Sequence, residues 1–143
     1  MLGRTMSTPP IPVDRGYTDD HTWVMLAPGD AVSDFPVRVG VTSAAVAAAG
    51  DPVRYELPAV GGHVKSGEQC GVAVAANAMW DLCAPISGRV TLINPAIMAD
   101  PGLVALDPYS QGWLFAVLPS ADPTLLTAAQ YAEKYARTNG ALV

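Results

Sequence analysis

Apolar residues along this chain recur in short runs that alternate with polar positions, and glycine and proline interrupt these runs throughout. Alternation with a period of two is typical of strands that are buried on one face. Because the 13 glycines and 13 prolines are spread along the chain, short strands joined by turns are favoured over a helical bundle. The pattern predicts a mainly β protein, a flattened sandwich of two antiparallel sheets, with strands at residues 17–26, 35–42, 51–58, 60–67, 89–94 and within 107–119.

Residues 71–88 form the longest patterned stretch and predict a β-hairpin. The apolar run stops at Asn77, restarts as Ala-Met-Trp-Asp and ends as Pro-Ile-Ser-Gly. Asn tolerates the unusual backbone dihedrals of a short hairpin turn. The tip is therefore expected at Ala76 and Asn77.

A turn centred between Ala76 and Asn77 also predicts the register, because opposed positions then have numbers that sum to 153. Directly opposed residues have Cβ atoms about 4.5 to 5.5 Å apart, so the two cysteines of the chain should be neighbours. This separation permits a disulfide without requiring one, and we expect reduced thiols with a packing role. The predicted pairs include Val74 with Met79, Ala73 with Trp80, and Cys70 with Cys83.

Two segments have helical patterns. Residues 43–50 are rich in alanine, and Thr42 or Ser43 is expected to cap the helix. Residues 124–137 carry apolar side chains at near-helical spacing, which predicts an amphipathic C-terminal helix. The stretch 95–104 is expected to be irregular, with one short helical turn.

The first 16 residues lack periodicity and contain a Thr-Pro-Pro-Ile-Pro sequence, so we expect residues 1–16 to be a flexible N-terminal arm. The arm is either a disordered leader or a segment that becomes ordered on a partner. Residues 17–143 are expected to form one domain, since 143 residues of which half are apolar suffice for one core.

Charge and composition narrow the function. A net charge of −5 and a pI of about 4.7 argue against binding to nucleic acid or to a membrane surface. No apolar run approaches the roughly 18 to 20 residues that span a bilayer, and the N-terminus lacks the apolar core of a secretory signal. Two cysteines do not make a disulfide framework, so the expected location is cytoplasmic.

Catalytic and metal chemistry find little support in the sequence. The only histidines, His21 and His63, lie far apart, and the chain has no Cys/His cluster with ligand spacing. No serine lies in a nucleophile-elbow pattern, and Cys70 and Cys83 lack a C-x-x-C arrangement. We therefore expect no catalytic residue, no metal site and no enzymatic activity.

Three motifs carry a resemblance to a known family: Tyr17-Thr-x-x-His-x-Trp23, Asp107-Pro-Tyr-x-x-Gly-Trp-Leu114, and the hairpin. The hairpin resembles the family pattern Gly-Val-Val-Glu-Ser-Val-Lys-Ala-Ala-Ser-Asp-Leu-Tyr-Ser-Pro-Val-Ser-Gly of the glycine cleavage system H protein, a lipoyl/biotinyl carrier fold. The resemblance implies a lipoyl-domain-like β-sandwich, or barrel-sandwich hybrid, with short peripheral helices and a C-terminal helix. The Trp and Tyr residues of these motifs, Trp23, Tyr109 and Trp113, are expected to be buried anchors.

The same alignment places the lipoylated lysine of the family at Asn77 and its flanking glutamate at Val74. Lipoate is joined to lysine through an amide, which requires an aliphatic amine. The carboxamide nitrogen of Asn is delocalised and cannot replace that amine. Only Lys65 and Lys134 remain, and neither lies in the hairpin pattern. The resemblance therefore implies that lipoate is absent and that the protein has no cofactor.

We expect a non-lipoylated, H-protein-like binding or scaffold subunit of a larger enzyme assembly. An apolar tip is unusual for a solvated loop, so Trp80 either folds back onto the body or contacts another protein. Two alternatives stay open, an H-protein-related component of glycine cleavage that works through its surface, and a carrier that uses Cys70, Cys83 or a lysine. The predicted partner-binding face consists of Ala76, Asn77, Ala78, Met79 and Trp80.

Overall fold

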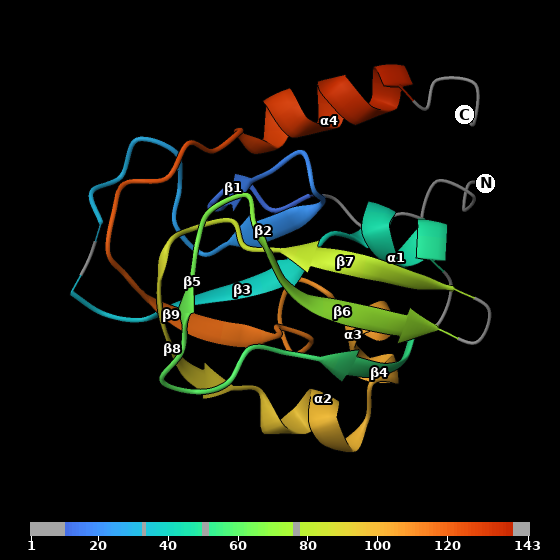
Figure 1. The fold of residues 1–143 in the computed structure, drawn as a ribbon. Coiled ribbons are helices and arrows are strands. Elements are labelled where there is room, and N and C mark those ends of the chain that lie inside the picture. The colour runs from blue at the N-terminus through green and yellow to red at the C-terminus, as the bar shows by residue number, and fades with distance from the viewer. Residues whose placement is uncertain (1–10, 33, 50–51, 76–77, 139–143) are drawn as a thin grey trace.

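The computed structural model describes residues 11–32, 34–49, 52–75 and 78–138, and it consists of two antiparallel sheets with short helices around them (Figure 1). The larger sheet has the strand order β1-β2-β3-β9-β8-β5, and the smaller sheet has the order β4-β6-β7. This arrangement confirms the predicted mainly β sandwich with a C-terminal helix.

The strands and helices follow the chain in a simple order. The larger sheet contains β1 (Gly16–Tyr17), β2 (Thr22–Val24), β3 (Val37–Val41), β5 (His63–Val64), β8 (Gly88–Ile93) and β9 (Phe115–Pro119). The smaller sheet contains β4 (Pro52–Glu56), β6 (Gln69–Ala75) and β7 (Met79–Cys83). The helices are α1 (Ser43–Ala49), α2 (Pro95–Ala99), α3 (Gly102–Leu106) and α4 (Ala128–Thr138).

A mostly aliphatic cluster from both sheets, which we call the inter-sheet core, holds the sandwich together. Strand alternation supplies it, as in β3, where Val37 and Val39 are buried and Arg38 between them is exposed. Tyr55 and Leu82 enter the same cluster from the smaller sheet. Burial of this apolar surface is the main stabilising contribution to such a fold.

A second cluster, which we call the aromatic cluster, lies between α4 and the end of the larger sheet that carries β1 and β2 (Figure 1). Trp23, Tyr109 and Trp113 are all at most 8% exposed, so the predicted anchor positions are confirmed. The indole N–H of Trp23 donates to the carbonyl oxygens of Val41 (3.0 Å) and Pro108 (3.1 Å). The buried members of the cluster are Tyr17, Trp23, Tyr109, Trp113, Ala116, Ala128 and Tyr131.

The predicted strand at 17–26 is wrong as a single element. A tight turn at residues 18–21 divides it into β1 and β2, which pair with each other. His21 ends this turn with a φ of 64°, in the left-handed region that few residues other than glycine adopt. The side chains of Thr18 and Thr22 close the turn with a hydrogen bond of 2.7 Å.

The other helical predictions differ in detail. Thr42 caps α1, since its hydroxyl oxygen accepts the N–H of Ala45 at 3.2 Å. The stretch 95–104, expected to be irregular, falls in α2 and α3. Asn94 begins α2, because its side chain accepts the N–H of Ala96.

The described part of the expected N-terminal arm lies against the domain. Arg15 is 8% exposed, donates to the carbonyl of Tyr109 and places its guanidinium 4.6 Å from the ring centroid of Trp23. Tyr17 donates to the carbonyl of Pro12 at 2.6 Å. Ile11, Arg15 and Gly16 therefore pack with the body, whereas Val13 is exposed, and residues 1–10 lie outside the described residues.

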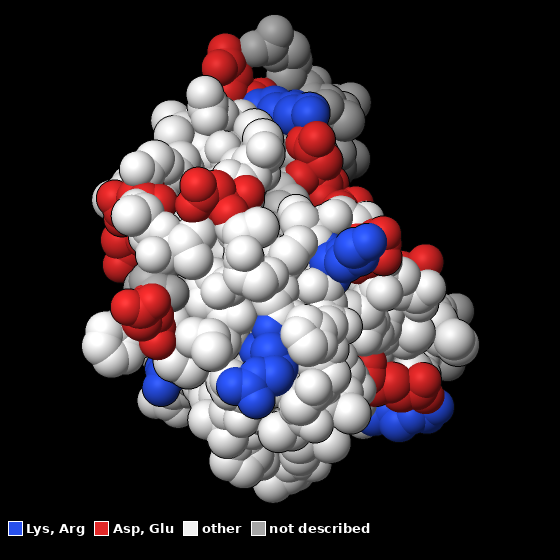
Figure 2. Space-filling view, turned by 60° about the vertical axis from the view of Figure 1, so that its left-hand side comes forward, with Lys and Arg blue, Asp and Glu red and all other residues white. Residues whose placement is uncertain are grey.

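Two surface properties bear on function. Within the described residues no helix is both long enough and apolar enough to cross a bilayer. Figure 2 shows Lys and Arg at a few separate places, several of them beside Asp or Glu. A wide basic patch, of the kind that binds nucleic acid, is absent from the described part of this face.

Candidate functional site

The hairpin predicted from the sequence consists of β6 and β7. Their paired residues confirm the predicted register near the tip, and the register changes only beyond Gly71. Val74 faces Met79 and Ala73 faces Trp80, as the sum of 153 requires. The N–H of Ala75 donates to the carbonyl of Ala78 at 2.8 Å, next to the tip. Ala76 and Asn77 themselves lie outside the described residues.

The predicted pairing of Cys70 with Cys83 is wrong. The register shifts between Gln69 and Gly71, so Cys70 is the extra residue of a β-bulge and Cys83 faces Gln69 instead. Both cysteines are free. Burial raises the pKa of Cys70 to about 11, with a smaller contribution from the nearby Cys83, and burial also raises the pKa of Cys83. Raised pKa values disfavour the reactive thiolate form.

The two faces of the hairpin differ in character. Ala73 is fully buried, and Trp80 beside it is half-buried and packs against the inter-sheet core. Of the two alternatives for Trp80, the described geometry therefore places it on the body. Met79 points the other way and is 68% exposed, and Ala78 is also exposed.

Valine side chains extend the outward face around Met79. Val74 lies directly opposite it and is half-buried. Val53 is 54% exposed, because a bulge between Pro52 and Arg54 takes it out of the inward alternation with Tyr55. The sequence did not predict that Val53 belongs to this outward face, because the pattern of apolar residues does not show where a bulge occurs.

The polar residues around this apolar face are paired among themselves. Arg54 forms an ion pair of 2.8 Å with Glu56, two residues along β4. Across the hairpin, the side-chain amide of Gln69 donates to the carboxylate of Asp81 at 2.9 Å. Exposed pairs of this kind add little stability, but they border the apolar centre with polar groups.

Neither lysine lies at the hairpin tip. Lys65 is exposed in the turn before β6, where its carbonyl accepts the N–H of Glu68 at 3.0 Å. The seven residues of β6 separate this turn from the tip, a span of about 23 Å at the usual rise of a strand. Lys134 lies on α4 and forms an ion pair of 2.6 Å with Asp19.

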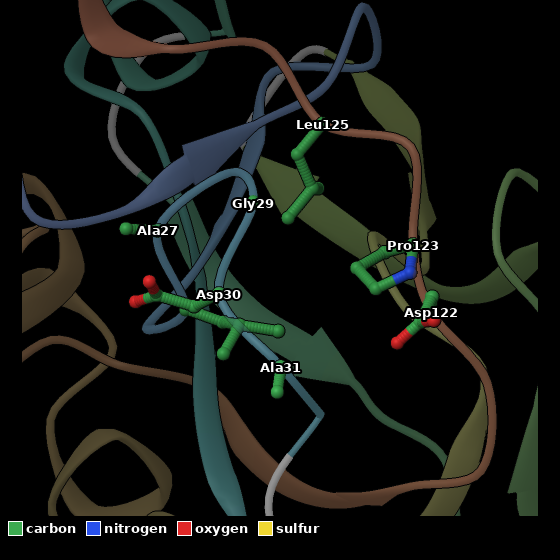
Figure 3. A pocket seen from close by; sticks show the side chains of 8 residues that line it. Ala27, Gly29, Asp30, Ala31, Asp122, Pro123 and Leu125 are labelled. Carbon is green, nitrogen blue, oxygen red and sulfur yellow. The ribbon is translucent and has the colours of Figure 1, made fainter.

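An open hollow of about 330 Å³ lies elsewhere on the surface, between the turn at 27–31 and the segment 122–125 (Figure 3). Pro123 and Leu125 point into it from one side, and no residue of β6 or β7 lines it. Among the described residues, no group of three or more His, Cys, Asp or Glu side chains could hold a metal ion.

Comparisons with known proteins agree with this geometry. The family model for "Glycine cleavage H-protein" matches residues 15–139. The glycine cleavage system H proteins of Corynebacterium aurimucosum and Beutenbergia cavernae are 39% and 42% identical to the chain. These matches cover 85% of the chain and 93% and 94% of the two relatives, respectively.

A crystal structure of a glycine cleavage system H protein from Mycobacterium marinum superposes on the fold with a TM-score of 0.84. Its sequence is 50% identical, and the match covers 87% of this chain and 98% of that one. Sequence motifs, hairpin register and three-dimensional similarity thus lead to one assignment: the chain belongs to the glycine cleavage H-protein family.

Proposed function

We propose that this protein is an H-protein-related, non-catalytic component of the glycine cleavage system that works through protein contacts and carries no lipoyl group. The observation that carries the proposal is Asn77 at the position where the family pattern has its lysine. The pairing of Val74 with Met79 supports this alignment, because it brackets the tip symmetrically. A location in the cytoplasm is part of the proposal.

The chemistry of the tip supports the absence of lipoate. Amide formation needs a free amine, and an Asn carboxamide does not supply one. Val74 stands where the family pattern has glutamate, so the outward face loses a charge as well as the attachment point. Compared with the family pattern, the hairpin keeps its paired strands, but its outward face is more apolar.

An apolar outward face suits contact with another protein. Val53 and Met79 are more than half exposed, and the neighbouring charged groups have polar partners within the protein, Arg54 with Glu56 and Asp81 with Gln69. The partner we infer is an enzyme of the glycine cleavage system with a complementary apolar surface. The proposed contact residues are Ala76, Asn77, Ala78, Met79 and the half-buried Trp80, which also packs against the inter-sheet core.

Intact-mass measurement tests the first part of the proposal. The native protein, and the purified protein after incubation with a lipoate ligase, are expected to carry no lipoyl adduct. Asn77→Lys is expected to be lipoylated poorly, because the modifying enzyme also reads neighbours such as Val74 and Trp80. An adduct on Lys65 or Lys134 in the native protein would replace the proposal with a carrier that uses another attachment residue.

Co-purification with the enzymes of a glycine cleavage system tests the second part. Met79→Gln is expected to weaken binding, because a polar side chain then occupies the centre of the apolar face. Met98→Gln is the matched control, since Met98 is 59% exposed but lies on α2. Equal loss in both variants, or no binding by the unaltered protein, would contradict the proposed face.

A further inference from the structure

The C-terminal helix is held to the β1–β2 turn by a network of side-chain hydrogen bonds. The hydroxyl of Tyr131 on α4 lies 2.7 Å from Nδ1 of His21 and 2.8 Å from the hydroxyl of Thr42. Tyr131 is 1% exposed and Thr42 is fully buried, so their two hydroxyls lie away from bulk water. One turn of helix further along, Tyr135 donates to the backbone carbonyl of Asp19 at 2.9 Å.

One direction of hydrogen bonding gives each hydroxyl hydrogen of this network an acceptor. The oxygen of Thr42 accepts the N–H of Ala45, and its hydroxyl donates to Tyr131. Tyr131 in turn donates to His21, whose Nδ1 must then be an unprotonated acceptor. The network therefore selects the neutral form of His21 with its proton on Nε2.

Protonation of His21 is incompatible with this direction of hydrogen bonding. Both ring nitrogens become donors, so Nδ1–H and the Thr42 hydroxyl both point at the oxygen of Tyr131. The hydroxyl hydrogen of Tyr131 then loses its acceptor, or it turns to the oxygen of Thr42 and leaves the hydroxyl hydrogen of Thr42 without one. Leaving a buried donor without a partner is unfavourable, so an imidazolium and the docked position of α4 oppose each other.

The groups that face His21 come from three elements. Its own turn supplies the carboxylates of Asp19 and Asp20, and Thr42, which caps α1, is uncharged. From α4, the ring of Tyr135 lies 4.5 Å from that of His21, and Lys134 is paired with Asp19. Burial lowers the pKa of His21 from its usual value near 6.5, although Asp20 and Asp19 act in the opposite direction.

We propose that α4 is a pH-responsive clamp, released from the β1–β2 turn when His21 takes up a proton. The clamp is distinct from the hairpin and does not depend on the function proposed for it. Release uncovers Tyr17 and Tyr131, whose stacked rings are 5.2 Å apart at the base of the helix. Mild acid thereby converts a covered aromatic surface into an exposed one.

The sign of the effect follows from the lowered pKa. The unfolded or undocked chain binds the proton more tightly than the docked state, so docking is strongest above pH 6.5 and weakens as the pH falls. The carboxyl of Asp19 keeps its charge in this range, because the hydrogen bond from Lys134 lowers its pKa below the usual value. The clamp therefore opens in mild acid through His21 and not through Asp19.

Amide hydrogen exchange of the full chain at pH 7.5 and pH 5.5, corrected for intrinsic rates, tests the clamp. Residues 128–138 are expected to lose protection against exchange at pH 5.5, while the central strands β3 and β9 of the larger sheet keep theirs. His21→Asn removes the titrating group and retains a residue that tolerates positive φ, so the pH dependence of α4 should disappear. His63→Asn is the matched control, since His63 is exposed on β5 and its loss should change nothing.

Protection of α4 that is the same at both pH values would overturn the clamp, as would an unchanged pH response in His21→Asn. Tyr131→Phe gives a second, independent readout if His21→Asn folds poorly. Without the hydroxyl, the NMR-detected pKa of His21 should differ from that of the unaltered protein. An identical His21 titration in Tyr131→Phe would show that the two groups are not coupled and would equally refute the proposal.

Discussion

Two buried tyrosines show how differently the two clusters of this protein are built. Tyr131 in the aromatic cluster has its hydroxyl bound to His21 and Thr42, at 2.7 and 2.8 Å. Tyr55 in the inter-sheet core is 6% exposed, and its hydroxyl has no hydrogen-bond partner among the residues that the structure describes. Burial raises the pKa of both phenols, to about 12 for Tyr131.

The two clusters are therefore stabilised by different kinds of interaction, non-directional apolar contact in one and directional hydrogen bonds in the other. The inter-sheet core is mostly aliphatic and gains its stability from apolar contact, which tolerates one unpaired polar atom at some loss of stability. The aromatic cluster joins α4, the turn at 18–21 and the start of α1 through specific donors and acceptors. Substitutions that delete only polar atoms should therefore affect the two clusters in opposite ways.

The largest effect is expected from Trp23→Ala. The indole is fully buried, donates to two carbonyls and lies beside Arg15. Its truncation should lower the free energy of unfolding by about 3 to 5 kcal/mol in denaturant titration. Trp80→Ala is the control and should cost less, since Trp80 is only half-buried. Equal losses would show that the aromatic cluster does not depend on its anchor.

Tyr131→Phe removes one oxygen and keeps the ring. The change leaves Nδ1 of His21 and the hydroxyl of Thr42 without this partner, so a loss of about 1 to 3 kcal/mol in the free energy of unfolding is expected. Thermal unfolding at pH 7.5, where His21 is neutral, measures the effect. An unchanged melting temperature would remove the distinction between the two clusters.

Tyr55→Phe is the reciprocal test in the inter-sheet core. The deleted hydroxyl is buried and has no partner in the described part of the chain, so the variant should be as stable as the unaltered protein or more stable by up to about 1 kcal/mol. The same denaturant titration decides the sign. A clear loss of stability would mean that the hydroxyl of Tyr55 forms a bond that stabilises the fold.

The smallest effect is expected on the outward face of the hairpin. Met79 is 68% exposed, so Met79→Gln should change the free energy of unfolding by no more than about 0.5 kcal/mol. Partner binding and stability should thus respond separately at this position. A larger loss of stability would place Met79 in a third packing cluster, contrary to its exposure.

Local geometry explains why the sequence alone predicted so much of the hairpin. A short turn determines the pairing of the residues on either side of it, so locating the tip at Ala76 and Asn77 predicted that Val74 faces Met79. The absence of an amine at position 77 is likewise a property of the residue itself, independent of any fold. The alternation of apolar residues predicted the sandwich for the same reason, since period-two burial is local.

Tertiary structure alone decided the features that join distant segments. His21 and Tyr131 are 110 residues apart, and no local pattern predicts their hydrogen bond. The bulge at Val53 arises where β4 pairs with β6, and the bulge at Cys70 arises where β6 pairs with β7. Beside Cys70, Gly71 leaves no room for a Cβ next to the carbonyl of Glu56. Sequence patterns specify which face of a strand is buried, whereas bulges, turn strain and cross-chain hydrogen bonds depend on which other segment packs against that face.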